Sequence, residues 1–238
     1  MAIIGVVYLA RGADPNWQAR IARFAESYMK HPAHCDHHVY VIYKQFANKD
    51  DLIWAKATLA PLKPTAIEDY IDFNSYAGGT FLEASRHVEE PLICFLGSTS
   101  EIMHDSWLAK LYDALKGPNV GVVCCTGSCG FITEFFPDLK YPNYHVRNLS
   151  FMINKGLYQE LASKVDWTDK PGEHKLADLG FEHGPNSMTA QIRAMGKGVL
   201  VVEADRVRPP EEWGDTTYRG NLHNVLVHDR GARDYQDL

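Results

Sequence analysis

The sequence of 238 residues lacks the features that mark membrane and secreted proteins. No apolar run approaches the roughly 20 residues that a membrane-spanning helix needs, so we expect no transmembrane segment. The opening residues up to Leu9 lack the basic start and small-residue cleavage site of a signal peptide and fit a first strand better. The five cysteines are an odd number, and their spacing does not match a disulfide scaffold. These absences favour reduced thiols and a cytoplasmic location.

The sequence also lacks an excess of positive charge. It carries 24 Lys and Arg residues against 30 Asp and Glu residues, a formal net charge of -6 at pH 7. A partner held through its phosphates needs clustered basic residues, so we expect no nucleic-acid partner. A hydrophobic content of 45% with 23% charged residues is typical of a folded globular chain. The composition does not set the oligomeric state, and a homo-oligomer stays open.

Strand-like and helix-like segments alternate along the first half of the chain. Apolar runs typical of buried strands lie at 3–9, 38–43, 66–71, 92–96 and 120–125. Amphipathic segments typical of helices lie between them, at 17–28, 51–59, 77–88 and 107–115. Asp14 and Pro15 are interpreted as the N-cap and first residue of the first helix. This alternation predicts parallel strands with both sheet faces covered.

The second half of the chain is less regular. We expect a strand at 150–153, a helix from Lys155, a helix at 186–195 and a strand at 198–202. The sequence thus predicts one α/β domain with a mainly parallel central sheet flanked by helices. That domain is expected to cover residues 1–204, with an irregular tail at 205–238 packed on it. Trp213 and Tyr218 are expected to pin the tail to the domain, with a ligand contact as the alternative.

Two segments resemble nucleotide-sugar glycosyltransferases of the GT-A fold, similar to family 2. In residues 91–102 a buried strand is followed by Ser98-Thr99-Ser100, at the place of the family's acidic Asp-x-Asp motif, and a helix starts near Trp107. In residues 181–202, Glu182-His183 stands where the family has an acidic pair on its acceptor side, followed by a helix, a glycine and a strand. The resemblance spans about residues 3–204. It implies a GT-A-like domain, a nucleotide-sugar donor, a glycan or other hydroxyl acceptor, and a role in polysaccharide biosynthesis.

The chain departs from this family at the metal motif. Hydroxyl groups cannot replace two anionic oxygens as the main ligands of manganese or magnesium. We therefore expect the usual metal site to be absent, and no cofactor is firmly implied. A divalent metal stays open, although Glu101 alone is a poor substitute for the motif. A second departure is Lys44-Gln45, where many relatives carry an acidic residue for the nucleotide base.

Without a metal, cationic side chains or a helix N-terminus must stabilise the leaving nucleoside diphosphate. Arg11 is the first candidate, because it follows the carboxyl end of the first strand, where open α/β sheets bind ligands. Most other basic residues are expected to be ordinary surface. The other cationic candidates are Lys44, Arg147, Arg193, Arg206, Arg208, His223 and His228. The full set of candidate substrate-binding residues is Arg11, Asp72, Asn74, Gly79, Ser98, Thr99, Ser100, Arg193 and His223.

Some candidate binding residues, and the candidate catalytic base, also have purely structural interpretations. Asp72 and Asn74 follow a predicted strand, where Asx residues also start turns for local reasons. Glu182 is the candidate catalytic base with His183 as its substitute, because an inverting transfer needs a base on the acceptor hydroxyl. Its alternative role is to cap the following helix or to neutralise Arg193.

Two further clusters have simple structural interpretations. One gathers histidines and a cysteine in a helix-to-strand connection without the two separated ligand pairs of a zinc site, so we expect a solvated loop. Its members are His31, His34, Cys35, His37 and His38. The other, residues 124–130, lacks the full P-loop pattern, so we expect its adjacent cysteines to pack in the core.

Three functions therefore stay open at this point. The first is a glycosyltransferase that works without the usual bound cation. The second is a sugar-nucleotide or glycan binding module without catalysis, which the missing Asp-x-Asp favours. The third is a nucleotidyltransferase, ranked last because the loop after Leu9 lacks the glycine-rich segment with Arg and Pro-Lys that such enzymes carry.

Overall fold

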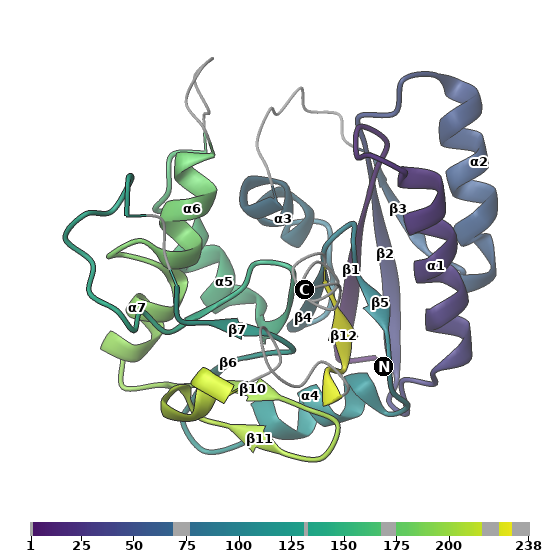
Figure 1. Cartoon of the computed structure of the whole chain (residues 1–238). Coiled ribbons are helices and arrows are strands. Elements are labelled where there is room, and N and C mark those ends of the chain that lie inside the picture. The colour runs from purple at the N-terminus through teal and green to yellow at the C-terminus, as the bar shows by residue number, and fades with distance from the viewer. Residues whose placement is uncertain (1, 69–76, 131–132, 168–174, 216–223, 230–238) are drawn as a thin grey trace.

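The computed structural model of the chain describes residues 2–68, 77–130, 133–167, 175–215 and 224–229. Its centre is an eight-stranded sheet in the order β11-β10-β6-β9-β4-β1-β2-β3 (Figure 1). The strands are β1 (Ile4–Arg11), β2 (His37–Lys44), β3 (Thr65–Glu68), β4 (Leu92–Leu96), β6 (Val120–Cys124), β9 (Ser150–Asn154), β10 (Gly198–Val202) and β11 (Val207–Arg208).

Most neighbouring strands of this sheet run parallel. Parallel pairs join β1 to β2 and β4, β2 to β3, and β6 to β10. Strand β9 runs antiparallel to both β4 and β6, and β11 runs antiparallel to β10. The prediction of a mainly parallel sheet is confirmed. The chain leaves β1 towards β2 and β3 on one side and returns to β4 on the other, so the strand order reverses between β1 and β4.

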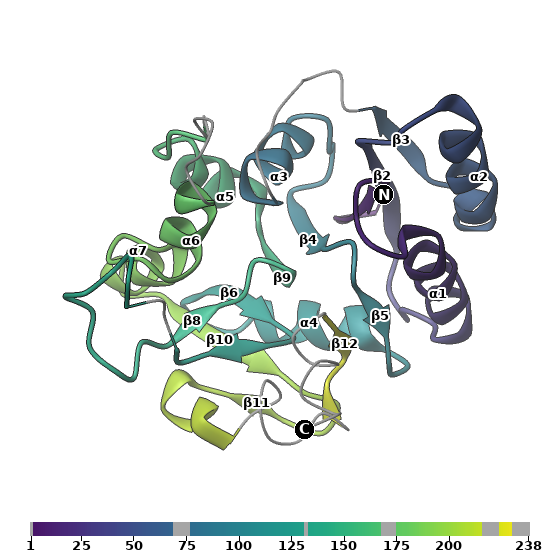
Figure 2. The ribbon, with the colours of Figure 1, turned by 45° about the horizontal axis from the view of Figure 1, so that its top comes forward.

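Helices cover both faces of the sheet (Figures 1 and 2). Alternate residues of each strand enter two separate cores, as the period of two in a strand requires: Val6 and Tyr8 enter the first, and Val7 and Leu9 the second. The first core is covered by α1 (Trp17–Lys30), α2 (Lys49–Leu59) and α4 (Trp107–Leu115). The second is covered by α3 (Ala77–Ser85), α5 (Lys155–Ala162), α6 (Leu176–His183) and α7 (Met188–Ala194).

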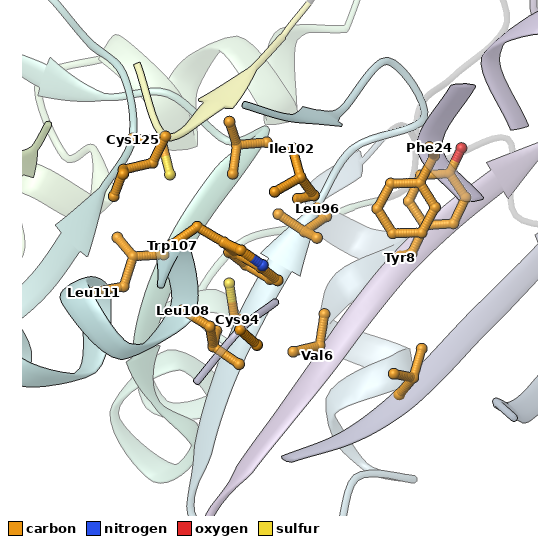
Figure 3. Packing of buried hydrophobic residues seen from close by; sticks show 14 of the residues in the cluster. Val6, Tyr8, Phe24, Cys94, Leu96, Ile102, Trp107, Leu108, Leu111 and Cys125 are labelled. Atoms are coloured by element: carbon orange, nitrogen blue, oxygen red, sulfur yellow. The ribbon is translucent and has the colours of Figure 1, made fainter. Parts of the chain in front are cut away.

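Aromatic side chains pack among the aliphatic ones in the first core (Figure 3). The ring of Tyr8 stacks on that of Phe24 of α1, with the ring centroids 3.6 Å apart. Trp107 of α4 is fully buried near Cys94 of β4. Burying one large apolar side chain contributes about 1.5–3 kcal/mol, so these contacts hold α1 and α4 firmly on the sheet.

The C-terminal tail joins the sheets as short strands. Beyond β11 lie a short 3-10 helix, η2 (Pro210–Asp215), and β12 (Val227–His228), which pairs with β5 (Glu101–Ile102). Trp213 is buried, and its Nε1 donates a hydrogen bond to the Arg208 carbonyl oxygen at 3.1 Å. The Trp213 ring also meets the Tyr144 ring edge-on, with the ring centroids 6.2 Å apart, so it contacts a residue outside the tail. Tyr218 lies outside the described residues.

The remaining short elements complete the second half of the chain. A two-stranded sheet joins β7 (Gly127–Ser128) to β8 (His145–Val146), and η1 (Ala60–Leu62) follows α2. Helix α6 was not predicted from the sequence. In the part of the chain that the structure describes, no helix has the length and apolar character needed to cross a membrane.

Candidate functional site

A cavity of about 270 Å³ lies at the carboxyl ends of β1, β2 and β4. The end of β1 contributes Arg11, the end of β2 contributes Lys44, and the loop after β4 contributes Ser98 and Thr99. Helices α3 and α6 supply further wall residues, among them Thr80. Open α/β sheets bind ligands outside the carboxyl ends of their strands, where the strand order reverses. This cavity occupies that position between β1 and β4.

The loop after β4 packs tightly against the chain that leads into β9. The amide of Gly97 donates a hydrogen bond to the Leu149 carbonyl oxygen at 2.7 Å. A Cβ atom on Gly97 would lie 2.8 Å from Cδ2 of Leu149, which is too close for any other residue without displacement. The start of this loop is therefore held against Leu149 at one side of the cavity.

Asp14 organises two arginines at this cavity. Its Oδ1 lies 2.8 Å from Nη1 of Arg11, and its Oδ2 lies 3.1 Å from Nη1 of Arg20 on α1. The Ser98 hydroxyl also donates to Oδ2 of Asp14. Nε of Arg11 donates to Oε1 of Gln45 at 2.7 Å, which fixes the guanidinium plane. Arg11 and Arg20 thus share the single carboxylate of Asp14, so this group of three side chains carries a net positive charge.

Lys44 adds a third cation to the cavity wall. It is 2% exposed, and its Nζ donates to Oγ1 of Thr80 on α3 at 2.7 Å. A buried ammonium group is stable only when it is hydrogen-bonded or faces an opposite charge. We call Arg11, Arg20 and Lys44 the cation cluster.

The residues at the position of the metal motif do not fit a manganese or magnesium ion. Ser98 donates its hydroxyl to Asp14, and Ser100 is buried with its Oγ donating to the Leu149 carbonyl oxygen at 3.4 Å. The carboxylate of Asp14 already serves two arginines. Within the described ranges, no three His, Cys, Asp or Glu side chains gather as a metal site. Hard divalent cations need several anionic or carbonyl oxygens that are free to coordinate.

Helix α6 carries two acidic residues into the cavity wall. Asp178, in its first turn, accepts a hydrogen bond at 2.7 Å from the amide of Gly78 near the start of α3. A Cβ atom on Gly78 would lie 2.3 Å from the Trp167 ring, so the close approach of these elements depends on glycine. Glu182 lies one turn further along the same helix face, in the last turn.

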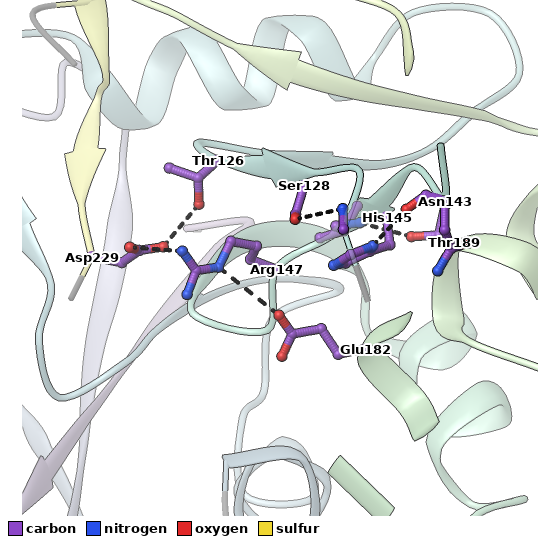
Figure 4. Close-up of polar contacts among 10 residues, drawn as sticks. Thr126, Ser128, Asn143, His145, Arg147, Glu182, Thr189 and Asp229 are labelled. Atoms are coloured by element: carbon purple, nitrogen blue, oxygen red, sulfur yellow. Dashed lines mark hydrogen bonds and ion pairs between the residues drawn. The ribbon is translucent and has the colours of Figure 1, made fainter. Parts of the chain in front are cut away.

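Glu182 belongs to a short chain of charged groups (Figure 4). Its Oε1 lies 3.9 Å from Nε of Arg147. Nη1 of Arg147 lies 3.2 Å from Oδ1 of Asp229, which is fully buried. Oδ2 of Asp229 accepts a hydrogen bond from the Thr126 hydroxyl at 3.0 Å. Arg147 is therefore shared between a cavity-wall carboxylate and a buried one.

This environment shifts the acid–base behaviour of Glu182. Burial raises the pKa of its carboxyl group from 4.5 to about 7. The positive charge of Arg147 opposes that rise, and the negative charges of Asp229 and Asp178 add to it. A carboxyl group that titrates near neutral pH can take and return a proton in the range where enzymes work.

His183, the predicted substitute base, occupies a different environment and does not line the cavity. It is 5% exposed, and its ring lies among those of Phe136 and His145, with centroid distances of 5.3 Å and 5.4 Å. Its backbone oxygen accepts a hydrogen bond from Nδ2 of Asn143 at 2.7 Å. Burial lowers the pKa of His183, and it lowers that of His145 to about 4, so the His145 ring is neutral at pH 7.

The structure brings part of the predicted substrate-binding set together. Arg11, Ser98 and Thr99 line the cavity, and Ser100 and Gly79 are buried next to residues that do. Asp72, Asn74 and His223 lie outside the described residues.

Arg193 has a different place from the one the sequence suggested. It lies on α7, where its Nη2 is 3.6 Å from Oε1 of Glu211, and it does not line the cavity. The helix-cap alternative for Glu182 is also not what the structure shows, because Ser187 caps α7 by accepting from the amide of Ala190.

The other cationic candidates serve structural contacts. Nε of Arg206 and Nε of Arg208 donate to Oε2 of Glu203 at 3.0 Å and 2.6 Å, and Glu203 is fully buried beneath them. His228 is buried in β12 opposite Glu101 of β5. Of the basic residues predicted from the sequence to bind the donor, Arg11 and Lys44 line the cavity. Arg147 does not line it but contacts Glu182, which does.

Sequence reasoning missed several lining residues. Asp14 was interpreted as a helix cap, but α1 begins at Trp17 after Asn16, and Asp14 instead binds the two arginines. The proximity of Asp14 to Arg11 along the chain was a usable signal. Asn148 and Asp178 stand in no recognisable motif, and only the fold brings them to this cavity.

The histidine cluster at residues 31–38 is explained by contacts within the protein. Each histidine side chain has a partner within the protein: His31 binds Asp105, His34 binds Ser106, His37 binds Tyr28 and His38 binds Glu90.

The cysteine pair lies in the core. Cys124 and Cys125 are fully buried, and burial raises the pKa of both thiols, that of Cys125 to about 12. Their burial confirms the expected core packing. The raised pKa values make these thiols poor nucleophiles at neutral pH.

Solved structures with the same arrangement include sugar-transferring and nucleotidyl-transferring enzymes. A mannosyltransferase from Pyrobaculum calidifontis, solved with GDP-Man and Mn²⁺, matches with a TM-score of 0.52 and 16% identity over 84% of this chain and 54% of its own. GalNAc-T7, solved with UDP, GalNAc and Mn²⁺, matches with a TM-score of 0.56 and 13% identity over 84% of this chain and 42% of its own. The chain has a GT-A-like fold.

A third match widens the range of chemistry found on this fold. The 4-diphosphocytidyl-2C-methyl-D-erythritol synthase from Anaerococcus prevotii matches with a TM-score of 0.51 and 13% identity over 84% of this chain and 88% of its own. The present chain spans about half the length of the mannosyltransferase, 54% of it. No family model matches the sequence, and no curated protein matches it either.

Proposed function

We propose that the protein is a glycosyltransferase that moves a sugar from a nucleotide-sugar donor to a hydroxyl group of a glycan or other acceptor, without a metal held by Asp-x-Asp. The observation that carries this proposal is a single cavity at the strand-order reversal with the cation cluster in one wall and Glu182 in another. The GT-A-like fold supports it, since two matching structures contain a nucleotide or nucleotide sugar. We also propose a cytoplasmic location, which fits five cysteines that form no disulfide among the described residues.

The cation cluster would stabilise the leaving nucleoside diphosphate. Transfer breaks the bond between the anomeric carbon and the phosphate oxygen, and the diphosphate leaves with the electron pair. Guanidinium groups bind phosphate oxygens with two parallel hydrogen bonds, and an ammonium group acts as a point charge. Asp14 holds Arg11 and Arg20 in place before a ligand arrives, so little reorganisation is needed.

Glu182 would remove the proton from the acceptor hydroxyl. As the acceptor oxygen forms its bond to the anomeric carbon, the proton passes to the ionised carboxylate of Glu182. A base is most effective when its pKa is close to the working pH. Burial raises the pKa of Glu182 to about 7, so the ionised base and its protonated form are both present near neutral pH.

The test measures donor binding and sugar transfer separately. Isothermal titration calorimetry with UDP-, GDP-, CDP- and TDP-sugars, in EDTA and in Mn²⁺, should give binding of one donor that does not depend on the metal. Glu182→Gln should bind that donor within about twofold of the wild type and lose about 10²–10⁴-fold in transfer rate. Glu160→Gln is the matched control, because Glu160 is exposed on α5 and pairs with Lys164.

Each other result would point to a different function. Donor binding only with Mn²⁺ would refute metal independence. Donor binding without transfer to any of a panel of glycan acceptors would favour the non-catalytic binding module. Release of pyrophosphate from a nucleoside triphosphate and a sugar phosphate would favour nucleotidyl transfer, the alternative supported by the match that covers 88% of the synthase chain.

A further inference from the structure

One buried amide in the cavity wall has no hydrogen-bond partner. Asn148 is 4% exposed and lines the cavity. Within the described part of the chain, neither its Oδ1 nor its Nδ2 has a partner. Leaving a buried polar group without a hydrogen bond destabilises the fold, and native structures keep few such groups. A group of this kind in a cavity wall points to bonds that a ligand supplies.

Neighbouring asparagines show how the chain satisfies this side chain elsewhere. Nδ2 of Asn143 donates to the His183 carbonyl oxygen at 2.7 Å. Oδ1 of Asn154 accepts from the Leu157 amide at 3.1 Å and caps α5. Asn148 has neither a capping contact nor a tertiary one within the described residues. Its amide is therefore not explained by the fold.

Asn148 lies in the chain between a residue that contacts Glu182 and a residue that contacts the loop beside Asp14. It follows Arg147, which lies 3.9 Å from Glu182. It precedes Leu149, whose carbonyl oxygen accepts from the amide of Gly97, beside the loop that binds Asp14. In a glycosyl transfer the moving sugar lies between its diphosphate and the base. Asn148 stands where that sugar ring would lie.

The chemistry of a carboxamide matches a sugar ring. The side chain offers one acceptor oxygen and two N–H donors, whereas each sugar hydroxyl both donates and accepts. Two adjacent hydroxyls can therefore satisfy the oxygen and the nitrogen together, and an apolar group would leave both unsatisfied. We infer that Asn148 recognises the transferred sugar by hydrogen-bonding two of its adjacent hydroxyls, and so selects the donor sugar. This inference rests on the proposed function.

The experiment compares Asn148→Ala with Asn154→Ala, the same chemical change six positions along the chain. Calorimetric titrations use UDP and GDP alone, and then UDP-glucose, UDP-galactose, UDP-GlcNAc and GDP-mannose. Asn148→Ala should bind the free nucleoside diphosphate within about twofold of the wild type, and the preferred sugar nucleotide about 10- to 100-fold more weakly. The preference between UDP-glucose and UDP-galactose, or between other sugars, should shrink by a similar factor.

The stability of the ligand-free protein gives a second, opposite signature. Removing an unsatisfied amide should leave the melting temperature of Asn148→Ala equal to or above that of the wild type. Asn154→Ala should melt at a lower temperature, because it removes a helix cap, yet bind every ligand normally. Asn148→Ser, which keeps one hydroxyl, should give an intermediate loss of sugar-nucleotide binding and covers the case in which the alanine variant folds poorly.

The outcomes separate this inference from the proposed function. If Asn148→Ala weakens free nucleoside diphosphate and sugar nucleotide equally, or weakens neither, the sugar role of Asn148 is wrong while the proposed function stands. If its ligand-free melting temperature falls as far as that of Asn154→Ala, the amide has a structural role and the inference is overturned. If the wild type binds no nucleoside diphosphate and no sugar nucleotide across the wider panel of UDP, GDP, CDP and TDP ligands, both proposals fail.

Discussion

Glu182 should make the folded protein less stable as the pH rises through 7. Burial on α6 raises the pKa of its carboxyl group from 4.5 to about 7, against the attraction of Arg147. The folded state therefore holds a proton between these pH values that the unfolded state releases. By linkage, the stability from this proton is fully present below about pH 4.5 and is lost as the pH rises through about 7.

The structure sets the size of this effect. A shift from 4.5 to about 7 corresponds to about 3 kcal/mol of unfolding free energy. The side chain of Glu182 is 22% exposed, so solvent screening reduces this figure, and we expect about 1–3 kcal/mol. Glu182→Gln replaces the group by a neutral one of the same shape. At pH 8 the variant should exceed the wild type in stability by this amount, and the difference should be clearly smaller at pH 5 and vanish below about pH 4.5.

Urea unfolding at pH values from 5 to 9 measures this difference, with the fluorescence of the five tryptophans as the signal. All other titrating groups are common to both proteins, so their contributions cancel in the comparison. Glu160→Gln provides the control, since its exposed ion pair with Lys164 contributes little at any pH. A stability difference between Glu182→Gln and the wild type that stays constant across the pH range would refute the argument, as would a less stable variant at pH 8.

Three further substitutions test the packing around the site. Gly78→Ala should lower the unfolding free energy by about 1–3 kcal/mol in thermal denaturation, because its Cβ would lie 2.3 Å from the Trp167 ring; an unchanged melting temperature would contradict this. Gly180→Ala, inside α6 with no atom within 4 Å of the new Cβ, should raise it by about 0.5–1 kcal/mol, and a loss in the same assay would count against the α6 geometry. Trp213→Ala should cost about 3–5 kcal/mol and expose the tail to trypsin, whereas unchanged digestion would show that Trp213 does not hold it.

The sheet could be predicted because its strands carry their own signal. Runs such as Ile4 to Leu9 and Leu92 to Leu96 are apolar on both faces, as strands buried between helices must be. The direction of β9 could not be predicted, since an apolar run looks the same in a parallel and an antiparallel strand. Helix α6 was missed because it has eight residues, contains Gly180 and begins after Lys175 without a side-chain cap.

The site residues also divide into those that the sequence could predict and those that only the fold reveals. Arg11 could be predicted because the end of the first strand is a general binding position in open α/β sheets. Asn148 and Asp178 could not, because each is an ordinary polar residue until the fold brings it to the cavity. Asp14 was assigned to a helix cap because an aspartate before a proline suits one, and local chemistry gave no sign of Arg20 or Ser98 as partners.

The missing metal motif and the arginine pair are connected through Asp14. In a metal-dependent site, two carboxylates and a divalent cation together carry almost no net charge. Here Ser98 stands at the metal-motif position and donates to Asp14, which two arginines share. An aspartate at position 98 would set two carboxylates against each other at that contact, so the hydroxyl suits the arginine pair better than the motif would. The excess positive charge is then part of the fold and is present before any ligand arrives.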